Sequence, residues 1–316
     1  MQIKNILITG GAGFIGSNLA NTLNKLGYRV LVIDSLKNGD VHDLDDGISF
    51  LKRDLTEFDL KEIRFQADMV FHLICTGLIE SIMYPRLDLN TNAGTIINVL
   101  EYAKKNNSMV AYTSSGAVHG LIGREDLPLH EKSRINPNNF YGLTKYMAEE
   151  YCRIYFQEFG VKSMAFRLWN VYGYPQRINY KIQWIPVVTA FLIQKNPTIF
   201  GTGDQSRDFT YVLDVVDGLI KGMEYLKDAT EFDIINLNGG AEVSIKELYD
   251  ICMDVRDETI PAQFGPKSSG DVPFLLADNS KARKKLGWKP RGIIEGINDY
   301  FKRLEGVDLS TLTVEE

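Results

Sequence analysis

Three glycines spaced three residues apart, Gly10, Gly13 and Gly16, separate an apolar stretch from a stretch with helical periodicity. The preceding residues, Ile3–Thr9, are mostly apolar and β-branched and predict a buried strand, whereas Ser17–Leu26 predicts a helix. Glycines at these positions permit a tight turn, a close approach of the backbone to a phosphate group, and close packing of the helix on the strand. The N–H groups at the start of the helix can bind the same phosphate. The loop therefore predicts a site for the pyrophosphate of a dinucleotide.

A carboxylate in the right place strengthens this prediction. The next predicted strand, Arg29–Asp34, ends in Asp34, eighteen residues after Gly16. At that position a carboxylate can accept hydrogen bonds from both ribose hydroxyls and would repel a 2′-phosphate, so NAD is favoured over NADP. The alternative role for Asp34 is that of a turn residue at the end of a strand. We assign Phe14 and Ile15, which lie inside the loop, to the same cofactor site.

Strand-like and helix-like stretches alternate through the first half of the chain, which predicts an α/β fold with a Rossmann-type, doubly wound parallel sheet. After Tyr172 the pattern is less regular and predicts a smaller mixed α/β domain. We expect residues 1–172 to bind NAD, with 208–238 returning to the same sheet. Residues 173–316 are expected to form mainly the substrate domain. Within 208–238, we expect a helix over Asp208–Gly222 and a strand over Phe232–Leu237.

Composition and charge exclude several other classes of protein. The net charge of −6, with Lys and Arg scattered along the chain, argues against nucleic-acid binding. Apolar runs of about five to eight residues are too short to span a membrane. The three cysteines, Cys75, Cys152 and Cys252, lack metal-ligand spacing, so we expect no metal site and reduced thiols in a cytoplasmic protein.

The spacing GxxGxxG of the loop resembles that of the extended short-chain dehydrogenase/reductases, the nucleotide-sugar epimerase and dehydratase family. The resemblance extends from Ile3 to about Leu304. It implies that Asp54 and Leu55 contact the adenine and that the strand end His72–Cys75, with Leu73, passes beside the cofactor. Cys75 replaces the usual alanine, and we interpret it as a small apolar residue.

A phenol and an ammonium group, Tyr141 and Lys145, are four residues apart and therefore lie on one face of a predicted helix. This spacing alone is common on helix surfaces. Upstream, residues 113–120 read TSSGAVHG at the end of a predicted parallel strand, where open α/β sheets bind ligands. The family resemblance then implies that Ser115 is the catalytic hydroxyl and Ser114 its structural neighbour.

These groups have complementary chemistry. As a base at neutral pH, Tyr141 needs its pKa lowered by about three units, or roughly 4 kcal/mol. Lys145 and the positive nicotinamide ring can both favour the phenolate. Tyr141 could then take the proton of a sugar hydroxyl while Ser115 hydrogen-bonds the same oxygen. Lys145 is also expected to hold the nicotinamide ribose.

Family members that eliminate water or decarboxylate carry Asp or Glu after the catalytic hydroxyl, but here Gly116 and Ala117 follow. The pattern is similar to that of 4-epimerases, closest to the UDP-hexose 4-epimerases. We therefore predict an NAD-dependent nucleotide-sugar epimerase acting at C4 through a transient 4-keto intermediate. Two alternatives remain, a 4-dehydrogenase or ketoreductase and a non-enzymatic NAD sensor. His119 replaces the usual tyrosine, and we interpret it as packed rather than titrating.

The resemblance also implies where a nucleotide-diphosphate sugar would bind. Asn170 and Arg207 match family residues that contact the diphosphate, and a guanidinium suits phosphate well. An ion pair of Arg207 with Asp208 or Asp214 is the alternative. Many relatives have a second arginine where this chain has Lys267, which either substitutes for it or reflects a different phosphate geometry. The residues expected to line the sugar end are Glu80 and Ser81.

Two short segments, Thr202–Gln205 and Gln183–Pro186, are expected near the nucleotide base. The predicted helices Ala93–Lys105 and Tyr141–Phe159 carry apolar faces, which in this family pair two subunits, so we predict a homodimer. Ala148 is the residue at which we expect a charge to separate the subunits.

Overall fold

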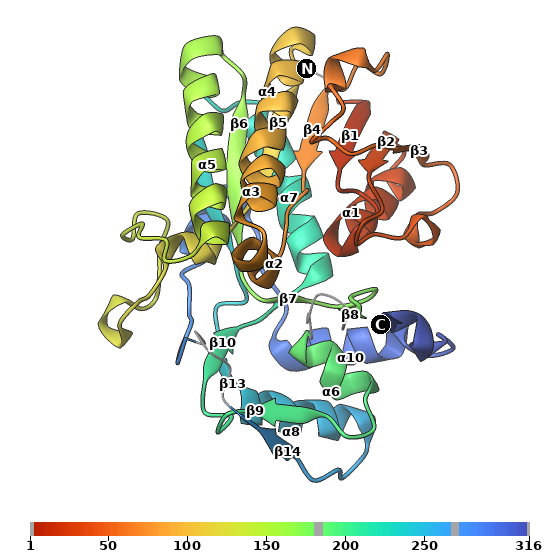
Figure 1. Cartoon of the computed structure of the whole chain (residues 1–316), viewed down its shortest axis with the longest axis vertical. Helices are drawn as coiled ribbons and strands as arrows, with labels where there is room; N and C mark the ends of the chain where they lie inside the picture. Colours follow the sequence, from red (N-terminus) through yellow and green to blue (C-terminus); the bar gives the residue numbers. More distant parts are fainter. Residues whose placement is uncertain (1–2, 180–185, 267–271, 315–316) are drawn as a thin grey trace.

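A seven-stranded parallel sheet forms the larger part of the molecule (Figure 1). The computed structural model describes residues 3–179, 186–266 and 272–314. The spatial order is β12-β6-β5-β4-β1-β2-β3, and every neighbouring pair is parallel. The strands are β1 (Asn5–Thr9), β2 (Arg29–Asp34), β3 (Ser49–Lys52), β4 (Met69–His72), β5 (Met109–Ser115), β6 (Ser163–Leu168) and β12 (Asp233–Leu237). The strand order reverses between β1 and β4, where such sheets bind ligands beyond their carboxyl ends.

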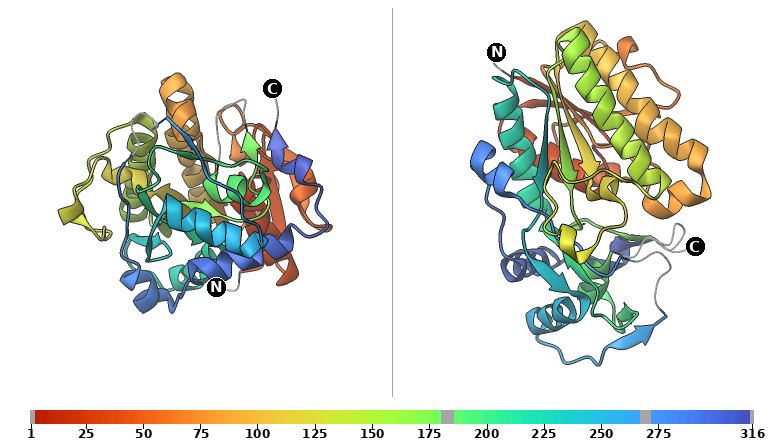
Figure 2. Two further views of the ribbon diagram at one scale, coloured as in Figure 1. Left: turned by 90° about the horizontal axis from the view of Figure 1, so that it is seen from below. Right: turned by 90° about the vertical axis from the view of Figure 1, so that its left-hand side faces the viewer.

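Helices cover both faces of the sheet (Figure 2). On one face α1 (Phe14–Lys25) and α7 (Val212–Leu226) bury apolar side chains such as Leu19 and Leu219 against the strands. On the other face α4 (Thr95–Asn106) and α5 (Phe140–Phe159) contribute a second core. Strands buried on both faces need continuous apolar runs, which explains the composition of β1, β4 and β5. The predicted doubly wound α/β fold is confirmed.

A smaller layer lies beyond the carboxyl ends of the strands (Figure 1). It has its own apolar core, which includes Phe191, Leu248 and Tyr300. Its main elements are α6 (Val187–Ile193), β9 (Thr198–Phe200), β10 (Ser206–Asp208), β13 (Glu242–Ser244), α8 (Ile245–Arg256), β14 (Gln263–Gly265) and α10 (Ile293–Arg303). The chain returns from this layer to the large sheet through α7 and β12. The shorter connecting elements are α2 (Leu78–Met83), α3 (Pro85–Asp88), β7 (Val171–Tyr172), β8 (Ile178–Asn179), β11 (Thr210–Tyr211), α9 (Ser280–Leu286) and β15 (Thr313–Val314).

Some boundaries differ from the sequence-based expectations. The helix expected over Asp208–Gly222 begins only at Val212, because β10 and β11 occupy the preceding residues. β3 was not predicted. The helix expected from Ala93 begins at Thr95, after a wider, π-helical turn over Leu89–Gly94. Within the described part of the chain, no helix combines the length and apolar character needed to cross a bilayer.

Candidate active site

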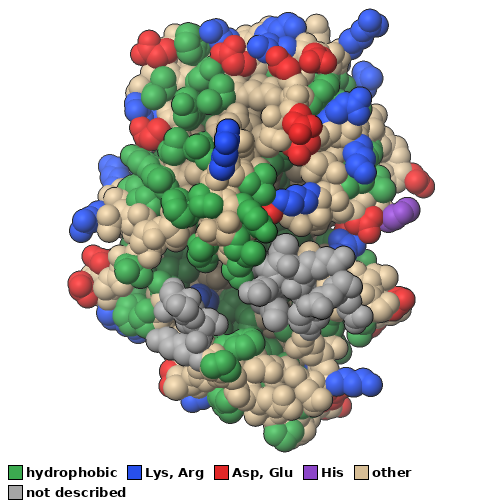
Figure 3. All heavy atoms as spheres, in the orientation of Figure 1, with side chains coloured by type: hydrophobic (Ala, Val, Ile, Leu, Met, Phe, Trp, Pro, Cys, Tyr) green, Lys and Arg blue, Asp and Glu red, His purple; other side chains and the backbone are tan. Residues whose placement is uncertain are grey.

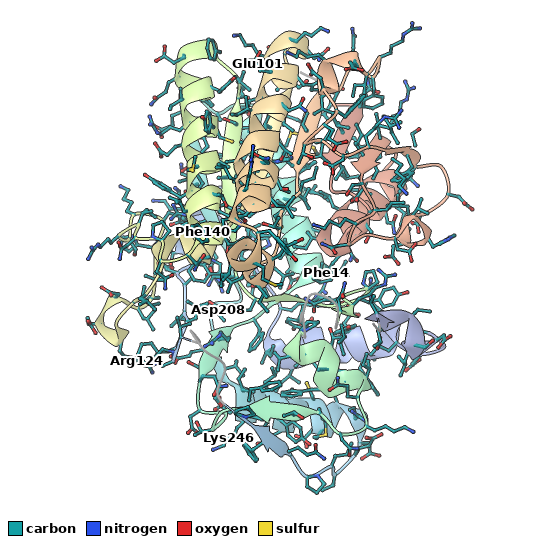
Figure 4. All side chains as sticks on the ribbon, in the orientation of Figure 1. Phe14, Glu101, Arg124, Phe140, Asp208 and Lys246 are labelled. Carbon is teal, nitrogen blue, oxygen red and sulfur yellow. The ribbon has the colours of Figure 1, made fainter. Side chains whose placement is uncertain are left out.

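The glycine loop is closed by packing on one side and open on the other. Gly10 has a φ of +75°, and a Cβ there would lie 2.9 Å from the backbone nitrogen of Ile74. A Cβ on Gly16 would lie 2.2 Å from the carbonyl oxygen of Gly10, so neither glycine can carry a side chain. A Cβ on Gly13 would meet only that same oxygen, at 3.3 Å, and Gly13 caps α1 without a side chain. The loop thus has room for a phosphate at the start of α1, where Phe14 lies at the boundary with the smaller layer (Figure 4).

Asp34 lies beside this loop at the end of β2. Its Oδ2 accepts a hydrogen bond from the Ala12 N–H at 3.1 Å and its Oδ1 accepts one from the Leu36 N–H at 2.8 Å. Burial raises the pKa of Asp34, and the backbone hydrogen bonds oppose that shift. Each oxygen keeps a second lone pair, so the carboxylate is suited to receive ribose hydroxyls. Of the two residues expected at the adenine, Asp54 is exposed, whereas the Leu55 side chain is buried in the core beneath α4.

The strand end after β4 lies directly against the loop. The Leu73 carbonyl carbon is 3.0 Å from the place where a Gly10 Cβ would be. His72 is fully buried, with its Nδ1 2.6 Å from the Thr9 hydroxyl and its Nε2 3.1 Å from the Thr95 hydroxyl. Burial lowers the pKa of His72 to about 3, so the ring is neutral and joins β1, β4 and α4. Cys75 is exposed.

Ser115, Tyr141 and Lys145 meet where β5 ends and α5 begins. A hydrogen bond joins the side chains of Ser115 and Tyr141. The Lys145 Nζ lies 5.7 Å from the centre of the Tyr141 ring and donates a hydrogen bond to the Thr113 carbonyl at 2.9 Å. Asn139 caps α5 by accepting a hydrogen bond from the Gly142 N–H at 2.8 Å, which fixes the first helical turn and with it Tyr141.

The electrostatics of this trio differ from the sequence-based expectation. Burial raises the pKa of Tyr141, electrostatic interactions with Cys75 and Asp88 act in the same direction, and the Ser115 hydrogen bond opposes the shift. Burial also lowers the pKa of Lys145. In the chain alone the phenol is therefore protonated at neutral pH, and Lys145 does not suffice to make it a base. Forming the phenolate requires a further positive charge.

Ser114 belongs to a buried ion-pair network behind the site. Its hydroxyl donates to Glu149 Oε1 at 2.5 Å, and Arg167 donates to both oxygens of the same carboxylate at 2.8 and 2.9 Å. Arg167 and Glu149 are both fully buried. A buried charge pair is tolerated when hydrogen bonds satisfy it in this way. Ser114 thus takes part in a buried hydrogen-bond network.

His119 is packed and neutral. Its Nδ1 is 2.9 Å from the Arg134 carbonyl, which can only accept, so this nitrogen carries the proton. Nε2 then accepts from Arg167 at 3.4 Å. Burial lowers the pKa of His119 to about 4. Its ring stacks on Trp169, whose indole also fills the space beside Gly116: a Cβ on Gly116 would lie 2.5 Å from the Trp169 ring.

The residues expected at the diphosphate lie around a cavity of about 290 Å³ between the sheet and the smaller layer. Asn170, Arg207 and Gln205 line it, together with Pro186 and Phe200. The carboxylates suggested as alternative partners of Arg207 are engaged elsewhere. Asp208 accepts from Asn238, Ala277 and Gly240, whereas Asp214 pairs with Arg291. Residues 183–185 and Lys267 lie outside the described residues.

Glu80 and Ser81 are both buried, and Glu80 has an unexpected partner. It forms an ion pair with Lys37, which lies in the loop that follows Asp34, while the Ser81 hydroxyl donates to the Leu78 carbonyl at 2.7 Å. The Oε2 atom of Glu80 is buried and makes no hydrogen bond to the described residues. Lys37 carried no sequence signal, because its partner lies 43 residues away. No group of three or more His, Cys, Asp or Glu side chains suited to a metal ion occurs in the described ranges.

The chain is similar to known proteins over most of its length. The NAD dependent epimerase/dehydratase family matches residues 6–237. A putative UDP-glucose 4-epimerase of Methanocaldococcus jannaschii is 34% identical over 302 residues, covering 92% of this chain and 95% of that protein. UDP-glucuronic acid decarboxylase 1 of Danio rerio is 30% identical over 318 residues, covering 95% and 73%. The solved UDP-N-acetylglucosamine 4-epimerase of Methanobrevibacter ruminantium M1, in complex with UDP-N-acetylmuramic acid, superimposes with a TM-score of 0.87 at 30% identity, covering 96% and 98%.

These matches confirm the resemblance that the sequence motifs predicted. The family model alone spans more than half of the chain, and the relatives align over nearly all of it. The chain therefore belongs to the NAD dependent epimerase/dehydratase family, an enzyme family whose cofactor is NAD.

Proposed function

We propose that the protein interconverts the C4 epimers of a UDP-linked sugar through a transient 4-keto sugar. The observation that carries this proposal is the meeting of Ser115, Tyr141 and Lys145 at the end of β5, with Gly116 and Ala117 in place of an acid. A second proton-transfer group is needed for elimination or decarboxylation but not for inversion at a ketone. The 4-epimerases among the relatives and solved structures support the same reaction.

The residues present fit NAD. The glycine loop, with Phe14 and Ile15, offers space and N–H groups for the pyrophosphate, and Asp34 offers a carboxylate for a ribose. Leu73 would lie beside the cofactor, and Asp54 and the backbone of Leu55 would contribute at the adenine. When bound, NAD supplies the hydride acceptor and donor, and its positive ring is the charge that Tyr141 needs.

The chain itself moves the proton. Tyr141, as phenolate, would take the proton of the sugar O4, and Ser115 would donate a hydrogen bond to that oxygen as it becomes a carbonyl. Lys145 would stabilise the phenolate by its charge and hold the adjacent ribose. Tyr141 then returns the proton after the ketone has presented its other face. Each group acts twice, so the reaction needs no net acid or base.

The substrate would lie between the sheet and the smaller layer. Asn170 and Arg207 line the cavity there and offer an amide and a guanidinium for the diphosphate. The segment that includes Gln205 would contact the base, and Glu80 and Ser81 would border the sugar. We assign cofactor binding to residues 1–172 together with 208–238, and mainly substrate binding to 173–316. The cytoplasmic location stays a prediction.

We also propose a homodimer formed through α4 and α5. Apolar side chains gather on the face that α5 and α2 form (Figure 3). On α5, Leu143 and Ile154 are 44% and 42% exposed and lie on the same side as Met147. Ala148, in contrast, is fully buried against the sheet of its own chain, so it is the wrong residue for a test of the interface. Ile154→Glu should yield a monomer in size-exclusion chromatography, and an unchanged dimer would contradict this interface.

The experiment that tests the function is incubation with a panel of UDP-sugars, followed by NMR of the product. We expect inversion at C4 with NAD regenerated, and loss of turnover in Tyr141→Phe. Accumulation of a free ketone with stoichiometric NADH would instead identify a dehydrogenase, the second candidate. If no sugar reacts and Tyr141→Phe retains the cellular function of the protein, a binding role would replace catalysis.

A further inference from the structure

Asp88, the last residue of α3, is a fully buried carboxylate, and three side chains donate hydrogen bonds to it. The Thr76 hydroxyl and the Asn92 amide donate to Oδ1, the latter at 2.8 Å. The Thr144 hydroxyl donates to Oδ2 at 2.8 Å. Burying a carboxylate is costly unless several donors form hydrogen bonds with it, and the three donors around Asp88 meet this requirement.

The three donors come from three different elements. Thr76 follows β4, next to Cys75, and its N–H donates to Asn92 Oδ1 at 2.9 Å. Asn92 lies in the π-helical turn before α4 and also donates to the Thr144 hydroxyl at 3.1 Å. Thr144 lies on α5 as the direct neighbour of Lys145 and one turn after Tyr141. Asp88 thus links the loop beside the cofactor site to the turn that carries the candidate catalytic groups.

We infer that Asp88 is a positioning residue for Tyr141 and Lys145, holding their helical turn against the loop after β4 through Thr144. This inference deepens the proposed function and rests on it. Rigid support of this kind matters because a displacement of about 1 Å at a reacting group can cost about a hundredfold in rate.

The charge of Asp88 adds a second, measurable effect. The titratable and polar groups that face Tyr141 and Lys145 are His72 on β4, Cys75 after β4, Tyr112 and Ser115 on β5, Asp88 on α3 and Glu149 on α5. Among these, the Asp88 charge raises the pKa of both Tyr141 and Lys145. Removing that charge therefore favours the phenolate at lower pH, and Lys145 also loses its proton at lower pH. Both limbs of the pH–rate profile should move towards acid.

Two variants separate the tether from the charge. Asp88→Asn removes the charge and replaces one accepting oxygen by a donor, whereas Thr144→Val removes the tether to α5 and keeps the charge. The matched control is Asp68→Asn. Asp68 accepts from the Lys4 and Asn5 N–H groups at 2.8 Å each, at the opposite end of β4.

Hydrogen–deuterium exchange of residues 140–148, which requires no substrate, is the first readout. It should accelerate by about tenfold in both test variants, as expected when a hydrogen bond to a charged group is lost, and remain unchanged in Asp68→Asn. The second readout is the pH dependence of kcat for C4 inversion. We expect an acid shift in Asp88→Asn alone, and a kcat lowered roughly tenfold to a hundredfold at an unshifted optimum in Thr144→Val.

Unchanged exchange in both test variants, or an unshifted profile in Asp88→Asn, would overturn the inference. If the wild-type protein inverts no UDP-sugar, the proposed function fails on its own, and the exchange experiment alone decides whether Asp88 holds the turn.

Discussion

The absence of an acid after Ser115 has a steric basis that can be tested at Gly116. The change is Gly116→Ala. The added Cβ would lie 2.5, 2.6 and 2.7 Å from three carbons of the six-membered ring of Trp169. That indole is 1% exposed, stacks on His119 at a ring-centre distance of 6.0 Å, and packs on Leu129 and Ala277, so it has no free direction in which to move.

The expected cost follows from the geometry. Forcing a methyl group into a well-packed region costs typically about 1–3 kcal/mol, so we expect Gly116→Ala to lower the free energy of unfolding by about 2 kcal/mol. Gly116→Asp should cost more, because it adds a buried carboxylate to the same clash. Trp169→Phe removes the part of the ring that the Cβ would meet. It sacrifices no hydrogen bond to the described residues, since the indole Nε1 has none there.

The assay is urea unfolding followed by circular dichroism, in a double-mutant cycle of Gly116→Ala with Trp169→Phe. We expect a coupling free energy of about 1–2 kcal/mol in favour of the double variant. The control is Gly292→Ala, where no atom lies within 4 Å of the added Cβ, and which should change stability by less than about 0.5 kcal/mol. Wild-type stability in Gly116→Ala, or no rescue by Trp169→Phe, would refute the steric explanation.

Four further predictions concern the site and its support. Cys75 is exposed and faces Tyr141, whereas the other two cysteines are buried, so N-ethylmaleimide should label Cys75 alone and NAD should slow the labelling. If NAD leaves the rate of labelling unchanged, Cys75 does not lie beside the cofactor. Ser115→Ala should lower kcat roughly a hundredfold to a thousandfold with a similar KM, and a kcat within a few-fold of wild type would remove Ser115 from the chemistry. Glu149→Ala leaves the buried Arg167 guanidinium without its carboxylate and should cost about 3–5 kcal/mol in urea unfolding; a loss below about 1 kcal/mol would speak against the network. The folded-state pKa of His119 is about 4, below its ordinary value of 6.5, so the unfolded chain binds the proton first and stability should fall by roughly 3 kcal/mol between pH 6.5 and pH 4. His119→Gln should flatten this dependence, and an equal slope in the variant would show that other groups cause it.

The parts of the site that depend on local sequence could be predicted. Gly10 and Gly16 were assigned from spacing alone, and both are required by backbone contacts below 3 Å. Asp34 was identified because the end of a strand has a clear sequence signal, and the structure places it beside the loop. These residues all belong to one βαβ unit, whose geometry follows from the local sequence. The sequence pattern alone therefore predicts where they lie.

Contacts between distant elements could not be predicted in this way. Gly39 packs against the Ala12 carbonyl, with its Cβ position 2.6 Å from that oxygen, yet nothing near Gly39 in the sequence indicates this. The Lys37–Glu80 ion pair and the contact of Trp169 with Gly116 are likewise set by how loops meet in space. Sequence reasoning also missed Asp88, because a lone Asp in a short helix carries no signal until its three donors are seen together.

Burial shifts the pKa values of Tyr141 and Lys145 in opposite directions, and these shifts make proton transfer depend on a further positive charge. It raises the pKa of Tyr141 and lowers that of Lys145, so it shifts both groups towards their neutral forms. A protonated phenol cannot abstract the proton of an alcohol. The balance shifts only when a further positive charge enters the same low-dielectric space, where its effect is larger than in water. The same burial that keeps Tyr141 protonated in the chain alone therefore makes it responsive to the positive charge of NAD, and a sugar bound without NAD would meet a phenol and not a base.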